Sequence, residues 1–571
     1  MAPASCRAAT LYGWRRVLHA PFWTVTGTGV HYKWGRPPSD LNRVSKPDQL
    51  WQPSDGSKRP AEDMNSRSEE PNGQEPHDSA DDASSGFLLK LAANQGTGSG
   101  RQGLARHAPL SEDTPDHRLS RAQAPRLLIF GFAGIILLGT VLLKLPAATT
   151  SGSSISWMEA LFTSTSAVTV TGLGVLTTAT DFSRFGQFII LVLLQVGGVG
   201  FIAFSVLLFR LVGRRVTLNE RFLIQQSLGA ERQFTWTRNW GRLGSVANLA
   251  LNVLIVTVSI EAIGTLLLWL RWRTELPDGE ALWLALFHAV SSYCNAGFDL
   301  FAGTEHAPVF GFGADYYTLA VMSALIVLGG VGVAVLYDVV SYFRNRMLSL
   351  NSRITLGLTV VLLIVGLAVM SLDRHLYEVT LAAYSLGEQI AISIFTVISS
   401  RTAGLTILPL HELSQSTQLM LLFWMFVGGA PASMAGGVTT STFGVLLISA
   451  LATAKGGDNQ AVAFGRSVPR ETLNKAVAIM TVSSLLVAAV TIVLSLFTQG
   501  DIFELGFEVV SAFANAGYSL GFTHKLNDWG QALIAFTMFW GRLGPLTIVI
   551  ALAQRERPSM LRYPEEPVIL G

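Results

Sequence analysis

Runs of about 20 apolar residues, long enough to cross the hydrocarbon core of a bilayer, constrain the fold of this chain more than any other feature. They lie at residues 125–147, 185–211, 245–270, 317–343, 354–372, 417–453, 475–498 and 530–553. Half of the 571 residues are hydrophobic and 14% are charged, a composition that argues against an ordinary soluble enzyme. The sequence therefore predicts an all-α integral membrane protein with about eight full spans.

Four shorter apolar segments lie between the members of successive pairs of spans, and each carries a glycine turn near its end. Their sequences are "SWMEALFTSTSAVTVTGLG", "ALWLALFHAVSSYCNAGF", "LGEQIAISIFTVISSRTAGL" and "IFELGFEVVSAFANAGYSLGF". Each is too short to cross a membrane and fits a re-entrant half-helix. The turn glycines Gly172, Gly297, Gly404 and Gly517 recur at similar intervals, as expected of an internal repeat.

The unit of span, half-helix, loop and span occurs four times, which predicts four repeats around a pseudo-fourfold axis. The repeats are assigned to residues 121–244, 245–350, 351–470 and 471–571, the last including a cytoplasmic C-terminal tail. Residues 1–120 are polar and are interpreted as a disordered extension or as the result of a wrongly assigned start codon. Irregular backbone at membrane depth persists only where protein buries it or water lines it, so a ring of such loops predicts a pore.

The loop "TVTGL" suits a cation. Backbone carbonyls replace the hydration shell of an ion without a full negative charge that would trap it. Gly172 allows backbone angles closed to other residues, and the β-branched neighbours stiffen the loop. The half-helix before it directs its negative C-terminal end at the same place.

Basic residues set the expected orientation. Arginines and lysines concentrate after the second, fourth, sixth and eighth spans, so both termini are expected in the cytoplasm and the half-helices enter from outside. The segment 270–280 is an exception, in which Arg271 and Arg273 are accompanied by three acids.

Several classes of function are excluded or made improbable by the residues that are missing. A net charge of +2 gives no basic surface for nucleic acid. Two cysteines, Cys6 and Cys294, form neither a disulfide framework nor a metal motif, and there is no P-loop. A polytopic membrane enzyme remains an alternative, but the spans hold almost none of the acids, histidines or metal ligands that it needs.

The sixth span is over-long and interrupted by "GGAPASMAGGVTTST", which includes Pro431. A loop at that depth would obstruct a pore, and small residues suit a segment that moves; close packing between helices is the alternative. Arg542 lies deep in its span and is expected to face the pore and donate to carbonyls of this loop, or else to pair with Glu261.

Other polar residues near the glycine turns have two readings each. Arg401 is interpreted as a brace that donates to loop carbonyls rather than as a functional cation. Asp299 could concentrate cations outside the second loop or be an ordinary solvated acid. His288 and Glu508, on the half-helices, are expected to be satisfied polar residues rather than ligands.

These motifs resemble a known family. The stretches "SAVTVTGL", "SYCNAGF", "SSRTAGL" and "FANAGY", with "QVGGVGF", "VLGGVGV", "FVGGAPASMAGGVTTSTF" and "GRLGPLT" in the spans that follow, resemble the Ktr/Trk/HKT superfamily of potassium transporters over residues 125–571. The loop "GRSVPRETLNKA" and the closing "YPEEPVILG" are most similar to the membrane subunit of Ktr systems.

The resemblance implies a set of site residues. The implied selectivity filter consists of Val170, Thr171, Gly172, Asn295, Ala296, Gly297, Thr402, Ala403, Gly404, Asn515, Ala516 and Gly517. The implied gate consists of Gly428, Gly429, Ala430, Ser433, Gly436, Gly437, Thr439, Thr440 and Arg542. No catalytic or metal-ligating residue is implied.

The resemblance also implies a function and partners. Potassium ion is the transported species, sodium is a second ion on which uptake depends, and no organic cofactor is expected. The expected assembly is a homodimer in a lipid bilayer, the bacterial inner (plasma) membrane, regulated by a cytoplasmic nucleotide-binding ring, with no nucleic acid. A Trk-like transporter, proton-coupled or with a different partner, is the alternative.

Overall fold

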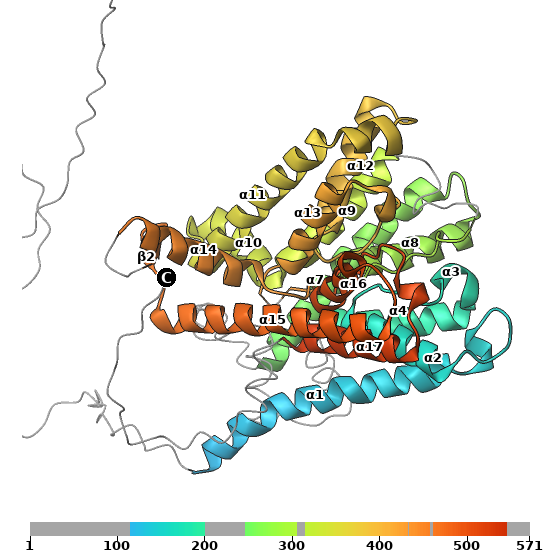
Figure 1. Ribbon diagram of the computed structural model, residues 1–571, viewed down its shortest axis with the longest axis horizontal. Coiled ribbons are helices and arrows are strands. Elements are labelled where there is room, and N and C mark those ends of the chain that lie inside the picture. Colours follow the sequence, from blue (N-terminus) through green and yellow to red (C-terminus); the bar gives the residue numbers. More distant parts are fainter. Residues whose placement is uncertain (1–114, 200–245, 305–314, 432, 457–460, 545–571) are drawn as a thin grey trace, which may run out of the picture. The chain divides into compact units, whose positions relative to one another are not determined.

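The computed structural model describes residues 115–199, 246–304, 315–431, 433–456 and 461–544 (Figure 1). Apart from one two-stranded hairpin, the regular structure in these ranges is helical. Most of the predicted N-terminal extension, the basic segment that follows residue 210 and the C-terminal tail lie outside them.

The helices follow one another in groups that can be traced by colour in Figure 1. The first group comprises α1 (Pro115–Leu143), η1 (Pro146–Ala148), α2 (Trp157–Thr169), α3 (Thr178–Asp181) and α4 (Arg184–Val199). The second comprises α7 (Val246–Trp272), α8 (Asp278–Tyr293), α9 (Tyr316–Val331) and α10 (Val333–Asn345).

The third group comprises α11 (Leu350–Leu372), the π-helical turn η3 (Leu376–Thr380), α12 (Leu386–Ser399), η4 (Leu410–Glu412), α13 (Gln415–Phe426) and α14 (Thr440–Ala454). A hairpin of β1 (Val462–Ala463) and β2 (Arg466–Ser467) follows, with Val462 opposite Ser467. The fourth group comprises α15 (Arg470–Phe497), α16 (Ile502–Ala514), η5 (Thr523–Lys525) and α17 (Asp528–Leu543).

Four short helices, α2, α8, α12 and α16, match the half-helices expected from the sequence; we call them the half-helices, and the helices α4, α9, α13 and α17 that follow them the inner helices. The first begins at a capping box, in which Ser156 N donates to Glu159 Oε2 at 2.7 Å and Glu159 N donates to Ser156 Oγ at 3.1 Å. All four end in buried turns, where each chain reverses into a loop. The last turn of each half-helix therefore lies in the protein interior, whereas residues near the start, such as Trp157 and Leu386, are exposed.

The contacts between groups follow chain order. Each inner helix packs against the half-helix of the next group: α4 against α8, α9 against α12, and α13 against α16. The last inner helix, α17, packs against the first half-helix, α2. The packing of these eight helices thus closes on itself.

The long helices that open each group present apolar side chains outward. Leu137 on α1, Ile263 on α7, Ile364 on α11 and Leu496 on α15 are 61%, 59%, 62% and 73% exposed. Apolar surface repeated on all four outer helices needs a non-aqueous covering. Three helices of the described part are long and apolar enough to cross a membrane, within Asn252–Trp272, Leu350–Leu372 and Arg470–Phe497, and the pair α9 and α10 counts as a fourth. The predicted spans 185–211 and 530–553 each run past the described ranges.

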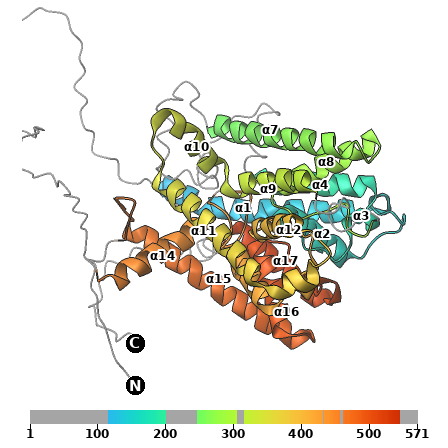
Figure 2. The same ribbon diagram turned by 90° about the horizontal axis from the view of Figure 1, so that it is seen from above.

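One predicted span differs from the structure. Residues 317–343 were expected to form one helix, but α9 ends at Val331 and α10 leaves it at an angle of 97° (Figure 2). Gly332 makes the break, with φ at +79°, a backbone region that residues with a Cβ seldom adopt. The last carbonyls of α9 are consequently free to accept hydrogen bonds from another segment.

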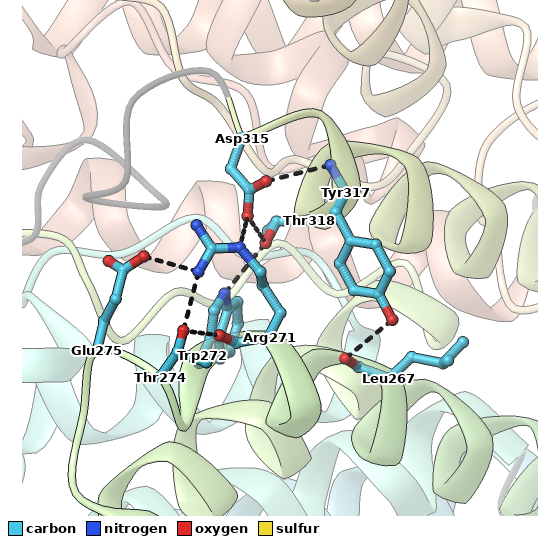
Figure 3. Close-up of polar contacts among 8 residues, drawn as sticks. All are labelled: Leu267, Arg271, Trp272, Thr274, Glu275, Asp315, Tyr317 and Thr318. Atoms are coloured by element: carbon cyan, nitrogen blue, oxygen red, sulfur yellow. Dashed lines mark hydrogen bonds and ion pairs between the residues drawn. The ribbon is translucent and has the colours of Figure 1, made fainter.

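A polar network fastens the end of α7 to the start of α9 (Figure 3). Arg271 donates to Glu275 Oε1 at 2.7 Å and forms an ion pair with Asp315 Oδ2 at 3.0 Å. Asp315 caps α9, and Trp272 Nε1 donates to Thr318 Oγ1 at 3.1 Å. Arg271, one of the two arginines of the segment 270–280, is thus paired with acids.

Candidate functional site

The loops that follow the four half-helices have the same backbone conformation. In each, the residue two positions before the glycine has a positive φ: 58° at Val170, 56° at Asn295, 76° at Thr402 and 51° at Asn515. The glycines themselves have φ values of 86°, 70°, 71° and 84° in the same order. A positive φ is uncommon for residues other than glycine, so four matching pairs mark one repeated loop structure.

A serine carbonyl holds each loop against its half-helix. Thr171 N donates to Ser166 O and Ala296 N donates to Ser291 O, both at 2.8 Å. Ala403 N donates to Ser399 O and Ala516 N donates to Ser511 O, both at 2.9 Å. These serines were not among the predicted site residues, although each stands four or five residues before the residue that precedes the glycine.

The four glycines lie side by side in a ring, which we call the glycine ring. A Cβ on Gly172 would lie 2.5 Å from the carbonyl oxygen of Ala296, and one on Gly297 would lie 2.9 Å from that of Ala403. On Gly404 it would collide with the carbonyl oxygen of Ala516, and on Gly517 with that of Thr171. Each glycine thus adjoins the carbonyl before the next glycine, and the order closes.

Two asparagines of the predicted filter donate hydrogen bonds from their side chains to the inner helices, and one of them also donates to a neighbouring loop. Asn515 Nδ2 donates to Met538 O on α17 and to Thr171 Oγ1, both at 2.9 Å. When the side-chain amide of Asn295 is oriented so that its nitrogen faces acceptors, Nδ2 donates to Ile326 O on α9 at 3.2 Å. These side chains fasten the loops to the inner helices, which leaves backbone carbonyls as the oxygens common to all four loops.

Residues 427–431 and 433–439 form irregular structure between α13 and α14, and we call this segment the 427–439 loop. Gly428 N donates to Val438 O at 2.8 Å, and Thr440 N donates to Gly429 O at 2.8 Å, so the two ends of the loop are tied together. Thr439 caps α14 through its side chain. The interruption expected in the sixth span is confirmed.

The 427–439 loop occupies the break in the neighbouring group and lies against the fourth half-helix. Ala430 N donates to Gly330 O at 2.8 Å and Met434 N donates to Gly329 O at 3.3 Å, so the loop uses the carbonyls freed at the end of α9. A Cβ on Gly436 would collide with Asn515 Oδ1 and lie 2.8 Å from Ala514 O. The loop therefore touches residues directly before the fourth loop glycine.

Arg542 joins the 427–439 loop to the first inner helix. Its Nη1 donates to Met434 O at 2.5 Å, and its Nη2 donates to Gly197 O at 2.5 Å and Gly198 O at 3.3 Å. Glu261, the alternative partner, instead accepts from Gln195 Nε2 at 2.9 Å and contacts Cys294 Sγ at 3.7 Å. Of the two predicted partners of Arg542, the structure therefore shows the loop carbonyl and not Glu261.

Arg401 contacts the 427–439 loop rather than its own filter loop. Its Nη2 donates to Gly428 O at 3.1 Å and to Thr440 Oγ1 at 2.9 Å. It is a donor to loop carbonyls as expected, but the acceptor belongs to a different loop.

The acids beside the second and fourth loops are engaged in local hydrogen bonds. Asp299 Oδ1 lies 3.0 Å from His288 Nε2 and accepts from Phe301 N at 2.8 Å. Glu508 accepts from Ser519 Oγ and from Thr523 Oγ1, the latter at 2.8 Å. Both carboxylates hold the chain that follows a loop glycine onto the half-helix before it.

The arrangement offers a cation neutral oxygens rather than charges. Four half-helices end at the glycine ring, and the negative ends of their dipoles add to the effect of the carbonyls. Within the described ranges no three His, Cys, Asp or Glu side chains gather as ligands for a resident metal. The ring is suited to brief coordination of a dehydrated monovalent ion.

Known proteins are similar in sequence to this part of the chain. The TrkH family, described as cation transport protein, matches residues 135–563. The chain is 34% identical over 451 residues to the Ktr system potassium uptake protein B of Bacillus subtilis (strain 168), a match that covers 79% of this chain and 97% of that protein. It is 34% identical over 461 residues to the potassium/sodium uptake protein NtpJ of Enterococcus hirae, covering 80% and 98%.

A solved structure has a similar fold. The crystal structure of the potassium transporter TrkH from Vibrio parahaemolyticus matches with a TM-score of 0.56 and 19% sequence identity, covering 76% of this chain and 86% of that one. The residues matched by the family include all four loops of the glycine ring and the 427–439 loop.

Proposed function

Because this chain belongs to the TrkH family of cation transport proteins, we propose that it takes up potassium ions through a pore centred on the glycine ring. The family is one of membrane transporters, so the chain is not an enzyme. The observation that carries the proposal is the closed order of glycines and carbonyls, in which Gly517 adjoins the carbonyl of Thr171.

The filter acts through backbone oxygens. An ion that enters the ring exchanges water for the carbonyls of residues 170–172, 295–297, 402–404 and 515–517, which the serine hydrogen bonds hold in position. The ring closes around one level of the pore, so the ion crosses few coordination steps. Potassium is favoured over the smaller sodium ion where the loops resist contraction.

The 427–439 loop is the gate. It lies against the residues before the fourth loop glycine, and its position depends on hydrogen bonds to three other segments. Arg542 adds a positive charge and a direct bond to the loop, so in the closed state it opposes a cation both electrostatically and sterically. Opening requires the loop to leave Arg542 and the end of α9.

The regulation and setting follow the Ktr relatives. The four repeats, residues 121–244, 245–350, 351–470 and 471–571, surround the pore, and both termini face the cytoplasm of a bacterial cell. The assembly is a homodimer in the plasma membrane whose gate is controlled by a cytoplasmic nucleotide-binding ring. Uptake depends on sodium in this proposal; sodium appears in the name of one relative, the potassium/sodium uptake protein NtpJ.

The test is uptake of potassium or rubidium by bacterial cells that lack their own potassium uptake systems. Cells expressing this chain are compared with and without a Ktr-type regulatory subunit, at zero and at millimolar sodium. Uptake that needs both the subunit and sodium is the expected result. Uptake indifferent to both identifies a Trk-like or unregulated pore, and no uptake above that of empty cells contradicts the proposal.

A further inference from the structure

The third repeat departs from the other three at one position of its loop. Three residues before the glycine, the first, second and fourth loops carry the small buried residues Thr169, Cys294 and Ala514. The third loop carries Arg401 there. A long cation at this point in an apolar protein needs a specific use.

The third repeat also lacks a packing contact that the others share. In the first, second and fourth repeats a glycine of the inner helix, Gly197, Gly329 or Gly541, lies directly against a carbonyl of the half-helix. That carbonyl belongs each time to the residue four before the loop glycine: Val168, Tyr293 or Phe513. The corresponding glycines of the third repeat, Gly428 and Gly429, follow α13. Their nearest neighbours are the later part of the 427–439 loop and Gly330, and not the half-helix.

Arg401 fills the place of the missing contact. Its Nη2 donates to Gly428 O at 3.1 Å, at the start of the 427–439 loop, and to Thr440 Oγ1 at 2.9 Å, on the first residue of α14, directly after the loop. Thr440 Oγ1 in turn donates to Gly428 O at 2.7 Å. One guanidinium nitrogen, one hydroxyl and one carbonyl therefore form a closed triangle between the third filter loop and both ends of the gate.

Arg401 leaves one donor of its guanidinium group unused. The Nε atom of Arg401 is buried without a hydrogen-bond partner in the part of the chain that the structure describes. Arg401 is partly buried, and losing Gly428 O and Thr440 Oγ1 would leave its charge with less compensation, so these contacts are expected to be held firmly.

We infer that Arg401 is a positioning residue that couples the third loop of the filter to the gate, so that displacement of the gate changes the support of this filter loop. The inference rests on the proposed function, since it concerns the filter and gate named there. When the 427–439 loop leaves its closed position, Gly428 O and Thr440 Oγ1 separate from Arg401 and the backbone at Thr402 loses a support. Gate position and ion preference are then linked properties of one pore.

A double-mutant cycle of Arg401→Gln and Thr440→Val tests the coupling in potassium-uptake-deficient cells. The readouts are rubidium uptake without the regulatory subunit, and the preference for potassium over sodium. Arg401→Gln is expected to raise subunit-independent uptake about tenfold, the change that loss of one hydrogen bond from a charged donor produces in an equilibrium. It is also expected to lower the ion preference, which a purely structural residue of the gate would leave unchanged.

The cycle gives the decisive comparison. The double variant is expected to leak no more than Arg401→Gln alone, because both substitutions break the same triangle. Effects that multiply, or an unchanged ion preference in Arg401→Gln, overturn the inference. Arg401→Lys keeps one donor and is expected to restore part of the closure.

Controls separate folding and function. Arg271→Gln removes an arginine of the α7–α9 network far along the chain from the triangle, and is expected to leave both readouts at wild-type values. If Arg401→Gln fails to accumulate in membranes, Thr440→Val against Thr440→Ser decides: a leak in the first but not the second supports the inference, and no leak in either overturns it. Absence of uptake by the wild type contradicts the proposed function instead.

Discussion

Gly172 is constrained in two ways that can be separated by substitution. Its φ of +86° strains any residue with a side chain, by about 1–3 kcal/mol. A Cβ there would also lie 2.5 Å from the carbonyl oxygen of Ala296, one of the oxygens of the proposed filter. Gly152 has a similar φ of +69°, but no atom lies within 4 Å of the position that a Cβ would take there.

Gly172→Ser is expected to weaken the preference for potassium over sodium, because the added side chain displaces the Ala296 carbonyl. Competitive flux assays with the two ions measure the change. Gly152→Ser carries comparable backbone strain in open space and is expected to keep the wild-type preference. An unchanged preference in Gly172→Ser removes this loop from the filter.

Arg542→Ala is expected to increase potassium flux in the absence of the regulatory subunit. The substitution removes the bond to Met434 O and those to the α4 carbonyls, and with them the positive charge opposing a cation. Arg184→Ala is a suitable control, since Arg184 is more than half exposed and pairs with Glu280 at 3.6 Å. Flux that stays level or falls, in a variant present at normal amounts, contradicts the role of Arg542 in the gate.

Asp373 gives a pH-dependent contribution to stability just beyond the end of α11. Burial alone would raise the pKa of this carboxyl, but hydrogen bonds from Ser414, Thr417 and the Leu376 and His375 N–H groups together hold it below its ordinary value of 3.8. A lowered pKa in the folded state stabilises the protein above pH 3.8, and this stabilisation is lost as the pH falls through the folded-state value.

Asp373→Asn is therefore expected to lower the melting temperature of the detergent-solubilised protein by a few degrees at pH 7. As the pH falls from 3.8 through the lower folded-state pKa, the wild type loses this contribution, and the melting temperatures of the two proteins are expected to converge. A difference that is constant across this pH range shows that the carboxylate charge does not contribute.

At the scale of elements, glycines on the inner helices allow the half-helices to approach closely. Gly541 lies against the carbonyl of Phe513, whereas Gly357 on α11 has no atom within 4 Å of an added Cβ. Gly541→Ala is expected to destabilise the protein by about 1–3 kcal/mol through overpacking. Gly357→Ala is expected to stabilise it by up to about 1 kcal/mol through helix propensity. Thermal unfolding in detergent tests both, and equal effects of the same sign rule out the packing argument.

Some elements could be predicted from the sequence and others could not. The half-helices were found because their length and terminal glycines are local properties. The break at Gly332 was missed because residues 317–343 stay apolar throughout, and hydropathy carries no information on direction. The bend goes together with a tertiary contact, because N–H groups of the 427–439 loop donate to the carbonyls of Gly329 and Gly330 that are freed at the end of α9.

The same limit applies to the candidate site. The loop glycines follow from a repeated pattern, but a serine in an apolar helix gives no sign that its carbonyl holds a loop. For Arg401 a carbonyl acceptor was predicted, and for Arg542 it was one of two alternatives, the other being Glu261. The identity of the acceptor does not follow from the sequence, because Met434 and Gly428 are brought to these arginines only by tertiary structure.

At the scale of the whole molecule, the family match begins at residue 135, and relatives match about four-fifths of this chain while being covered almost completely themselves. A variant that lacks residues 1–114 is therefore expected to support potassium uptake at the wild-type rate. Uptake per amount of protein in the membrane is the measurement. A marked loss of uptake, at equal amounts, assigns a transport role to the extension.

The closure of the glycine ring has a consequence for synthesis of the protein. The first loop meets the last although they are far apart in the chain: Asn515 Nδ2 donates to Thr171 Oγ1 over 344 positions of sequence. Since domains form from the N-terminus as the ribosome proceeds, the first loop waits for its neighbour until translation is nearly complete. A nascent chain that stops before α16 lacks the fourth loop, so the glycine ring cannot close in it.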